Sequence, residues 1–151
     1  MRTLFADAGY WIALLHPRDA LHAAAQSMTP IVAASRIVTS EAVLVELLDA
    51  FAAPPQSARR PRTRRGAPSY RRAARDLVGN VMRDAHVTVV TSSSALFHEA
   101  VSLYGERLDQ TWGMTDCMSF TIMRARGITE ALAHDEHFVQ AGFRALLREK
   151  S

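Results

Sequence analysis

The amino-acid sequence predicts an α/β fold with a central parallel sheet of about four to five short strands and helices on both faces. Short apolar segments alternate with segments of helical periodicity along the chain, and this alternation is typical of parallel sheets. A length of 151 residues and a hydrophobic content of 48% are sufficient for one domain with a core. We therefore expect a single domain that spans residues 1–151.

The first strand is expected at residues 3–6, a short apolar run that ends at Asp7. Apolar residues at helical spacing predict a helix over residues 8–15, which Pro17 ends. An alanine-rich helix is expected over residues 19–28. Judged alone, Asp7 is most simply a helix N-cap, although the carboxyl end of a strand is also where open α/β sheets bind ligands.

A second strand is expected at residues 36–39, followed by a helix at residues 41–52 that Ser40 can cap. Glu46 lies beside the apolar stripe of this helix. A carboxylate buried there would need a cation or a proton to compensate its charge. A boundary residue that reaches water explains Glu46 equally well.

Residues 53–69 are rich in Pro and Arg, and we expect them to form a mobile loop. The basic charge is concentrated here, because eight arginines and no acid occur between residues 59 and 75, which leaves 10 basic against 15 acidic residues elsewhere. A solvated insertion explains this charge as well as RNA binding does. The loop arginines that could neutralise RNA phosphates are Arg59, Arg60, Arg62, Arg64 and Arg65.

The second half of the chain continues the alternation of helices and strands. The expected elements are a helix over 70–84, a strand over 86–91, a helix over 95–104 that ends near Gly105, a helix from Thr115 to Gly127, a strand over 130–133, a helical turn over 136–140 and an edge strand over 143–147. Thr115 can cap its helix and would place Asp116 in the first turn. An acid there is ordinary, because carboxylates stabilise helix N-termini by about 0.3–1 kcal/mol.

Four acids nevertheless occupy positions that can converge at the carboxyl edge of one parallel sheet. They are Asp7, Glu46, Asp116 and Asp135. Two carboxylates about 4 Å apart repel by roughly 4 kcal/mol at an effective dielectric of 20, so such a cluster needs cations. Oxygen ligands favour Mg²⁺ or Mn²⁺, which can activate a water for attack on a phosphodiester.

Four short motifs surround these acids in a fixed order: Phe5-Ala6-Asp7, residues 39–48, residues 112–120 and residues 133–138. Together they resemble PIN-domain ribonucleases, in particular the VapC-type toxins of bacterial toxin–antitoxin systems. The resemblance implies a PIN-like fold and a Mg²⁺- or Mn²⁺-dependent endoribonuclease. In such an enzyme the acidic quartet would hold the metal, and metal-activated water would hydrolyse RNA.

The resemblance also implies partners: RNA (tRNA, rRNA or mRNA), a small cognate antitoxin protein and a second copy in a homodimer. It suggests an outer set of residues near the acids. Thr39 or Ser40 could contact a substrate phosphate or be only caps, Asp109 could be an additional acid, and Thr115 could support Asp116. The chain departs from the family pattern at Gly113, where a serine is common.

Two other functions fit parts of the sequence. A catalytically silent PIN-like module could act as an RNA- or protein-binding scaffold, although the intact quartet argues against it. A receiver-like phosphoacceptor domain would need a lysine near its last strand, and the only lysine is Lys150. The pair His134 and His137 flanks Asp135, and we expect it to shape the turn rather than to bind zinc.

Composition and the N-terminal sequence indicate the expected cellular location and the role of the cysteine and the tryptophans. No apolar run of 18 residues occurs, which excludes a membrane-spanning helix, and Asp7 interrupts any signal-peptide core, so a cytoplasmic location is expected. Cys117 is the only cysteine, and we expect it to be buried and unpaired. Trp11 and Trp112 are expected to be core or interface residues.

Overall fold

The computed structural model describes residues 1–52 and 68–149, which contain one five-stranded sheet with all neighbouring strands parallel. The strands are β1 (Thr3–Ala6), β2 (Arg36–Ser40), β3 (Val87–Val90), β4 (Glu130–Leu132) and β5 (Arg144–Ala145). The helices are α1 (Ala8–Leu15), α2 (His22–Ser27), α3 (Thr29–Ala33), α4 (Glu41–Ala50), α5 (Pro68–Arg83), α6 (Ser94–Glu106), α7 (Met114–Arg126) and α8 (Glu136–Gln140). The predicted α/β fold with a parallel sheet is confirmed.

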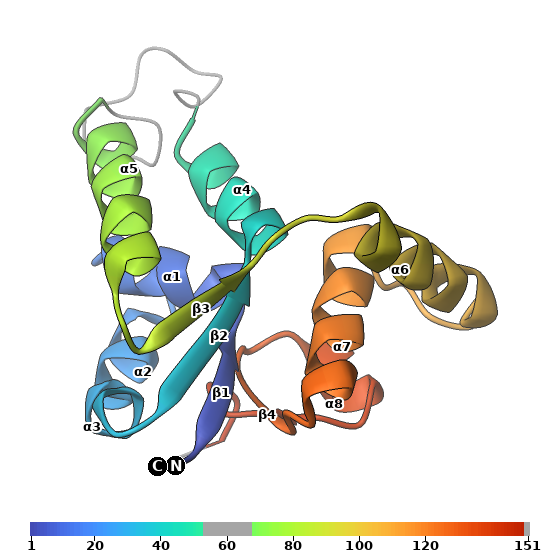
Figure 1. The fold of residues 1–151 in the computed structure, drawn as a ribbon. Coiled ribbons are helices and arrows are strands. Elements are labelled where there is room, and N and C mark those ends of the chain that lie inside the picture. The colour runs from blue at the N-terminus through green and yellow to red at the C-terminus, as the bar shows by residue number, and fades with distance from the viewer. Residues whose placement is uncertain (53–67, 150–151) are drawn as a thin grey trace.

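The sheet has the strand order β3-β2-β1-β4-β5, so β1 and β4 are neighbours although more than a hundred residues separate them. The chain first moves outward from β1 to β3 and then returns to the other side of β1. Helices α1 to α3 and α5 lie on one side of the sheet and α6 to α8 on the other (Figure 1). The strand order therefore reverses between β1 and β4, and a crevice at the carboxyl ends of the strands is expected at such a reversal.

An aromatic group in the core holds α7 and α8 against the sheet. Phe138 of α8 packs edge to face on Phe120 of α7 with ring centroids 5.0 Å apart, and on Phe5 of β1 at 6.5 Å. Trp112 packs on Phe120 at 5.0 Å. Trp11 is buried on the other side of the sheet. The predictions that both tryptophans belong to the core and that Cys117 is buried are confirmed.

The predicted alanine-rich helix corresponds to α2, and a second short helix, α3, follows it directly. The two helices meet at Met28. Pro30 has no N–H to donate to the Gln26 carbonyl, and the hydroxyl of Thr29 donates to that carbonyl instead at 2.7 Å. The proline therefore starts a new helix. The predicted end near Met28 is confirmed, because α2 ends at Ser27 with Met28 as its C-cap, whereas α2 begins at His22 rather than near Asp19 and α3 was not predicted.

Two helix boundaries also differ from prediction. Helix α6 continues through Gly105 to Glu106, so this glycine does not end it. The N-cap of α7 is Gly113 rather than Thr115, which lies inside the first turn. The predicted end of α7 is confirmed, because Gly127 adopts a left-handed conformation with φ of 66°.

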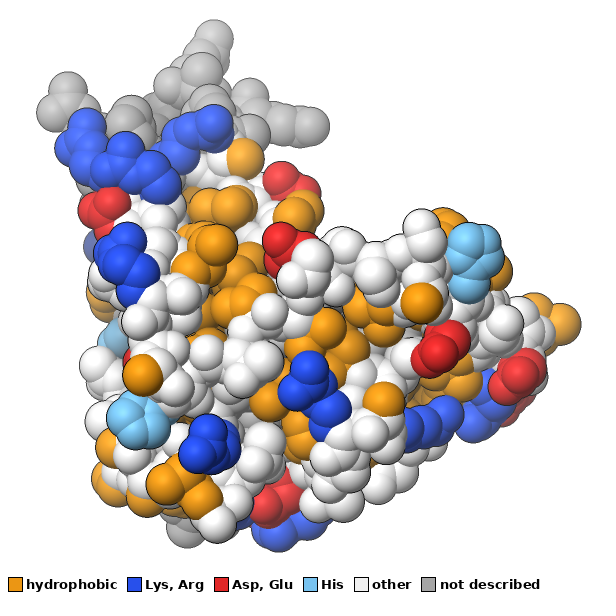
Figure 2. Space-filling model, viewed as in Figure 1, with side chains coloured by type: hydrophobic (Ala, Val, Ile, Leu, Met, Phe, Trp, Pro, Cys, Tyr) orange, Lys and Arg blue, Asp and Glu red, His pale blue; other side chains and the backbone are white. Residues whose placement is uncertain are grey.

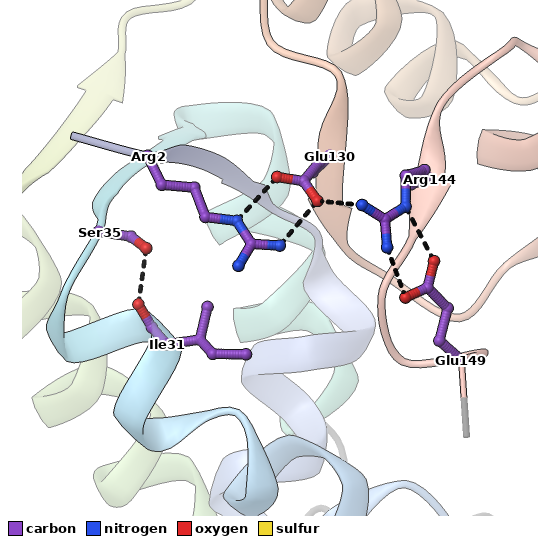
Figure 3. Close-up of polar contacts among 6 residues, drawn as sticks. All are labelled: Arg2, Ile31, Ser35, Glu130, Arg144 and Glu149. Carbon is purple, nitrogen blue, oxygen red and sulfur yellow. Dashed lines mark hydrogen bonds and ion pairs between the residues drawn. The ribbon is translucent and has the colours of Figure 1, made fainter. Parts of the chain in front are cut away.

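The two ends of the described chain are joined by ion pairs across the sheet (Figure 3). Glu130 at the start of β4 accepts two hydrogen bonds from Arg2 at 2.8 and 2.7 Å and one from Arg144 at 2.8 Å. Arg144 donates in turn to Glu149 at 3.0 and 2.8 Å. Strands β1, β4 and β5 are therefore connected by side chains as well as by their backbones.

Most of the predicted Pro- and Arg-rich loop lies outside the described residues. This applies to residues 53–67 and therefore to Arg59, Arg60, Arg62, Arg64 and Arg65. The last two residues of that segment, Pro68 and Ser69, belong to α5. Within the described ranges, no helix has both the length and the apolar character needed to cross a bilayer.

Candidate functional site

The site lies where the strand order reverses, at the carboxyl ends of β1 and β4. Asp7 follows β1 directly, and its backbone N–H donates to the Leu132 carbonyl of β4 at 3.2 Å. Asp135 follows β4 by three residues and is the N-cap of α8. The two acids therefore leave adjacent strands toward the same edge of the sheet.

Asp7 occupies the N-cap position of α1, but its side chain makes no cap hydrogen bond. Burial is the main cause that raises the pKa of Asp7 from 3.8 to about 7, and a backbone hydrogen bond from Ala8 opposes it. The nearby charges of Glu46, Asp116 and Asp135 raise it further. The Asp7 carboxylate therefore neither caps α1 nor forms an ion pair with a described residue.

Glu46 reaches the same cleft from α4. The hydroxyl of Ser40 accepts a hydrogen bond from the Val43 N–H at 3.1 Å and so caps this helix, as predicted. Val43 and Leu47 bury the apolar face of α4, while Glu46 stays exposed beside it. Desolvation and then the charges of Asp116 and Asp135 raise the pKa of Glu46.

Asp116 is held in the first turn of α7. Its Oδ2 atom accepts from the Gly113 N–H at 3.2 Å and from His137 Nδ1 at 2.9 Å. Its side chain is only 19% exposed. The Asp116 carboxylate therefore stabilises the start of α7 by accepting from the Gly113 N–H, and it also lines the cleft.

His137 joins the two acids that come from different elements. Its Nδ1 atom lies 2.9 Å from Asp116 Oδ2 and 3.3 Å from Asp135 Oδ1. The other ring nitrogen, Nε2, lies 3.2 Å from the Thr111 hydroxyl, so both nitrogens of His137 are within hydrogen-bond distance of a partner. The imidazole orients both carboxylates, which is more than the turn-shaping role expected from the sequence.

All four predicted acids line one open cleft of about 860 Å³. The charged side chains around it are Asp7, Glu46, Asp49, Asp116, Asp135, Glu136 and Arg148. Arg148 is the only cation among these lining residues, and its Nη1 atom donates to the His134 carbonyl at 2.9 Å. Sequence analysis overlooked Arg148, because it lies outside every motif.

The side chains in the cleft fit a divalent cation. Asp116, Asp135 and His137 each offer a ligand atom, and these atoms lie within 4.8 Å of one another. Carboxylate oxygens are the donors that Mg²⁺ and Mn²⁺ prefer. A cation here would also relieve the repulsion that raises the pKa of Asp7 and Glu46.

The residues expected around the acids are not in the cleft lining. Thr39 is fully buried, where its hydroxyl donates to the Ala6 carbonyl at 2.8 Å and lies 3.5 Å from Trp11 Nε1. Ser40 is 1% exposed and caps α4. Because both hydroxyls are enclosed in the protein, the expected contact with a substrate phosphate is not supported. Thr39 instead holds the carbonyl that precedes Asp7.

Asp109 and Thr115 differ from expectation for separate reasons. Asp109 is exposed and pairs with Arg107 at 3.0 Å, which lowers the pKa of its carboxyl. It does not line the cleft. Thr115 does not cap α7, and its carbonyl accepts from the Ser119 hydroxyl at 2.9 Å.

Comparison with known proteins gives a family and a solved relative. The family model described as PIN domain matches residues 4–144. No curated protein sequence matches. The crystal structure of Mycobacterium tuberculosis VapC20, described as a toxin that cleaves the sarcin–ricin loop, is similar with a TM-score of 0.75 and 26% sequence identity, and the match covers 93% of this chain and 95% of that chain. With its strand order, its crevice and its acidic cleft, this chain belongs to the PIN-domain family.

Proposed function

We propose that this protein is a divalent-metal-dependent endoribonuclease of the VapC type, the toxin of a toxin–antitoxin pair. The observation that carries the proposal is the placement of four carboxylates from four elements in one cleft. Sequence and structural similarity to PIN-domain proteins supports the nuclease chemistry.

The four acids have distinct tasks in this proposal. Asp7, Glu46, Asp116 and Asp135 would hold the ion, and His137 would keep Asp116 and Asp135 turned toward it by hydrogen bonding. The bound ion supplies Lewis acidity toward water and phosphate oxygens. Asp7 must lose its proton to bind a cation, and burial raises its pKa to about 7, so cation binding near or below that pH would release a proton from Asp7.

Mg²⁺ and Mn²⁺ both fit the oxygen donors of the quartet. We propose that either supports activity, and that the ion enters through the open cleft, where Glu46 and Asp135 are exposed.

The proposed substrate is RNA, and the sarcin–ricin loop is the first sequence to test because VapC20 is described as cleaving it. The proposed protein partners are a small antitoxin and a second copy of this chain. Helix α6 presents exposed apolar side chains that suit such contacts: Phe97, Val101 and Tyr104.

The test removes one charge at a time from the quartet. Asp116→Asn keeps the shape of the side chain and still offers an oxygen to the Gly113 N–H, so the helix start should survive. We expect Asp116→Asn and Asp7→Asn to lose at least 100-fold of RNA cleavage in Mg²⁺. Cleavage of labelled RNA and circular dichroism would be measured for both variants and for the wild type.

The matched control is Asp109→Asn, which removes an exposed acid outside the cleft. This control should cleave RNA like the wild type. Retained cleavage in Asp116→Asn and Asp7→Asn would refute the proposal. If the wild type neither cleaves RNA nor binds Mn²⁺ in calorimetry, a silent scaffold becomes the better description.

A further inference from the structure

Within the described residues, Arg148 is the one arginine that lines the acidic cleft. Among the residues that line it, six carry carboxylates and only Arg148 carries a guanidinium. An RNA strand brings further negative charge into this cleft. A divalent ion held by the quartet can neutralise only part of the combined charge, so a fixed positive group beside it would favour a phosphate.

Arg148 is fixed in place by the backbone around it. The N–H groups of Leu146 and Leu147 donate to the carbonyls of Ala131 and Ala133 at 2.9 and 3.1 Å. Both leucine side chains are buried, each 6% exposed. The segment before Arg148 therefore continues along β4 and cannot move away from the cleft without unpacking the core.

The guanidinium is anchored at one atom only. Arg148 Nη1 donates to the His134 carbonyl at 2.9 Å, and His134 directly precedes Asp135. A guanidinium has five N–H donors in a planar fork. The remaining donors make no hydrogen bond with the described residues that reaches the usual distance, so they are available to a ligand in the cleft.

Two other arginines in this part of the molecule, Arg2 and Arg144, form ion pairs and so differ from Arg148. Arg2 donates two hydrogen bonds to Glu130, and Arg144 donates one to Glu130 and two to Glu149 (Figure 3). Arg148 forms no ion pair within 4.0 Å with any acid of residues 1–52 and 68–149, although six acids line the same cleft. If its task were to neutralise the acids, an ion pair would be expected.

We propose that Arg148 binds a phosphate of the RNA strand that enters the cleft. Its planar fork matches two oxygens of one phosphate, and its anchor on His134 sets that phosphate beside Asp135. The contact is made to the backbone, so it carries no base specificity. This inference rests on the proposed ribonuclease function and assigns the group that positions its substrate.

The experiment measures RNA binding without cleavage. Arg148→Gln and Arg148→Lys would each be combined with Asp116→Asn, and the affinity for a labelled sarcin–ricin-loop hairpin and for a labelled oligouridine would be followed by fluorescence anisotropy at several salt concentrations. Arg126→Gln is the matched control, because Arg126 is an exposed arginine in the last turn of α7, at the end opposite Asp116.

We expect Arg148→Gln to weaken binding of both RNAs by roughly tenfold and to reduce the salt slope by about one phosphate contact. Arg148→Lys should retain most of the salt slope because it retains the charge, and Arg126→Gln should bind like the parent. In the background with Asp116 intact, Arg148→Gln should raise KM more than it lowers kcat. Calorimetric Mn²⁺ affinity should not decrease.

Several outcomes would overturn the inference. Equal affinity and salt slope for Arg148→Gln and Arg126→Gln would exclude a phosphate contact. A loss of Mn²⁺ affinity or of thermal stability in both Arg148 variants would assign the side chain to the structure of the acidic cluster instead. In each case cleavage that depends on Asp116 would leave the proposed function intact, whereas cleavage by Asp116→Asn alone would refute the proposed function.

Discussion

Asp7 is the residue whose ionisation opposes folding most clearly. Its pKa is raised from 3.8 to about 7 by burial and by neighbouring acids. Between these values the folded protein binds more protons than the unfolded chain, so the free energy of unfolding falls as pH rises through this window. A bound cation would reverse this cost by replacing the proton.

We therefore predict that Asp7→Asn stabilises the metal-free protein at pH 8, relative to the wild type. The amide cannot ionise, so the decline in stability between about pH 4 and pH 7 should become shallower. Urea unfolding in EDTA at several pH values would measure it. Parallel stability curves for the two proteins would show that Asp7 does not titrate in this way.

At the residue scale, the sequence could indicate acids but not their contacts. Asp7 and Asp135 were predictable as residues that follow strands of a parallel sheet. The contact between His137 and Asp116 was not, because it depends on how α8 packs against α7. The spacing of Asp135 and His137, two residues apart at a helix start, was the available signal. Arg148 lies outside every motif in the sequence, so its position in the cleft could not be predicted.

Helix α4 carries Glu46 into the cleft and begins with a serine cap. We predict that Ser40→Ala lowers the free energy of unfolding by about 1 kcal/mol, because the Val43 N–H loses its acceptor. It should also weaken Mn²⁺ binding, since the helix start fixes the direction of Glu46. Urea unfolding and calorimetry would measure the two effects.

Ser93→Ala provides the control at the scale of a helix. Ser93 caps α6 by the same hydrogen bond, to Leu96 N–H at 3.1 Å, but α6 contributes no residue to the cleft. This variant should lose similar stability and keep its Mn²⁺ affinity. Equal Mn²⁺ affinities for both cap variants would contradict the link between the α4 cap and the site.

The helices and strands themselves were largely predictable, and their ends were less so. Short runs rich in apolar and β-branched residues located the five strands, because such side chains suit a pleated and largely buried sheet. The short helix α3, which has Pro30 in its first turn, was not predicted. The helix predicted to end near Gly105 extends one residue beyond it, to Glu106. A glycine inside a helix lowers its stability by only about 1 kcal/mol, and the packing of α6 on α7 compensates for that loss. The N-cap of α7 is Gly113 rather than Thr115, and the Asp116 carboxylate accepts a hydrogen bond from the Gly113 N–H.

At the scale of the whole molecule, Glu130 connects three strands. The hydrogen bond from Arg2 is the main cause that lowers its pKa, and the nearby charges of Arg2 and Arg144 add to it. The stability it contributes is therefore present above the unfolded-state pKa near 4.5 and is lost as pH falls through the lower folded-state value.

We predict that Glu130→Gln lowers the free energy of unfolding by roughly 1–2 kcal/mol at pH 7, because its side chain is only 15% exposed, Arg2 loses its carboxylate partner and Arg144 keeps only Glu149. The loss should shrink in high salt and vanish at low pH. Chemical unfolding at two salt concentrations would measure it. A loss independent of salt and pH would indicate a packing defect instead.

The strand order could not be read from alternation alone. Alternating helices and strands predict a parallel sheet, but several orders satisfy that pattern. The pairing of β1 with β4 follows from contacts between residues more than a hundred positions apart. The strand order was therefore not predicted and comes from the structure.

That pairing has a consequence for the timing of synthesis. The first acid of the cleft is at residue 7, whereas Asp135 and Arg148 come near the end of the described chain. A ribosome that is still making this protein holds a nascent chain in which β1 lacks its neighbour β4. The cleft cannot be complete until the segment from Glu130 to Arg148 has left the ribosome. A nascent chain that ends before Glu130 therefore cannot form the site that we propose for RNA cleavage.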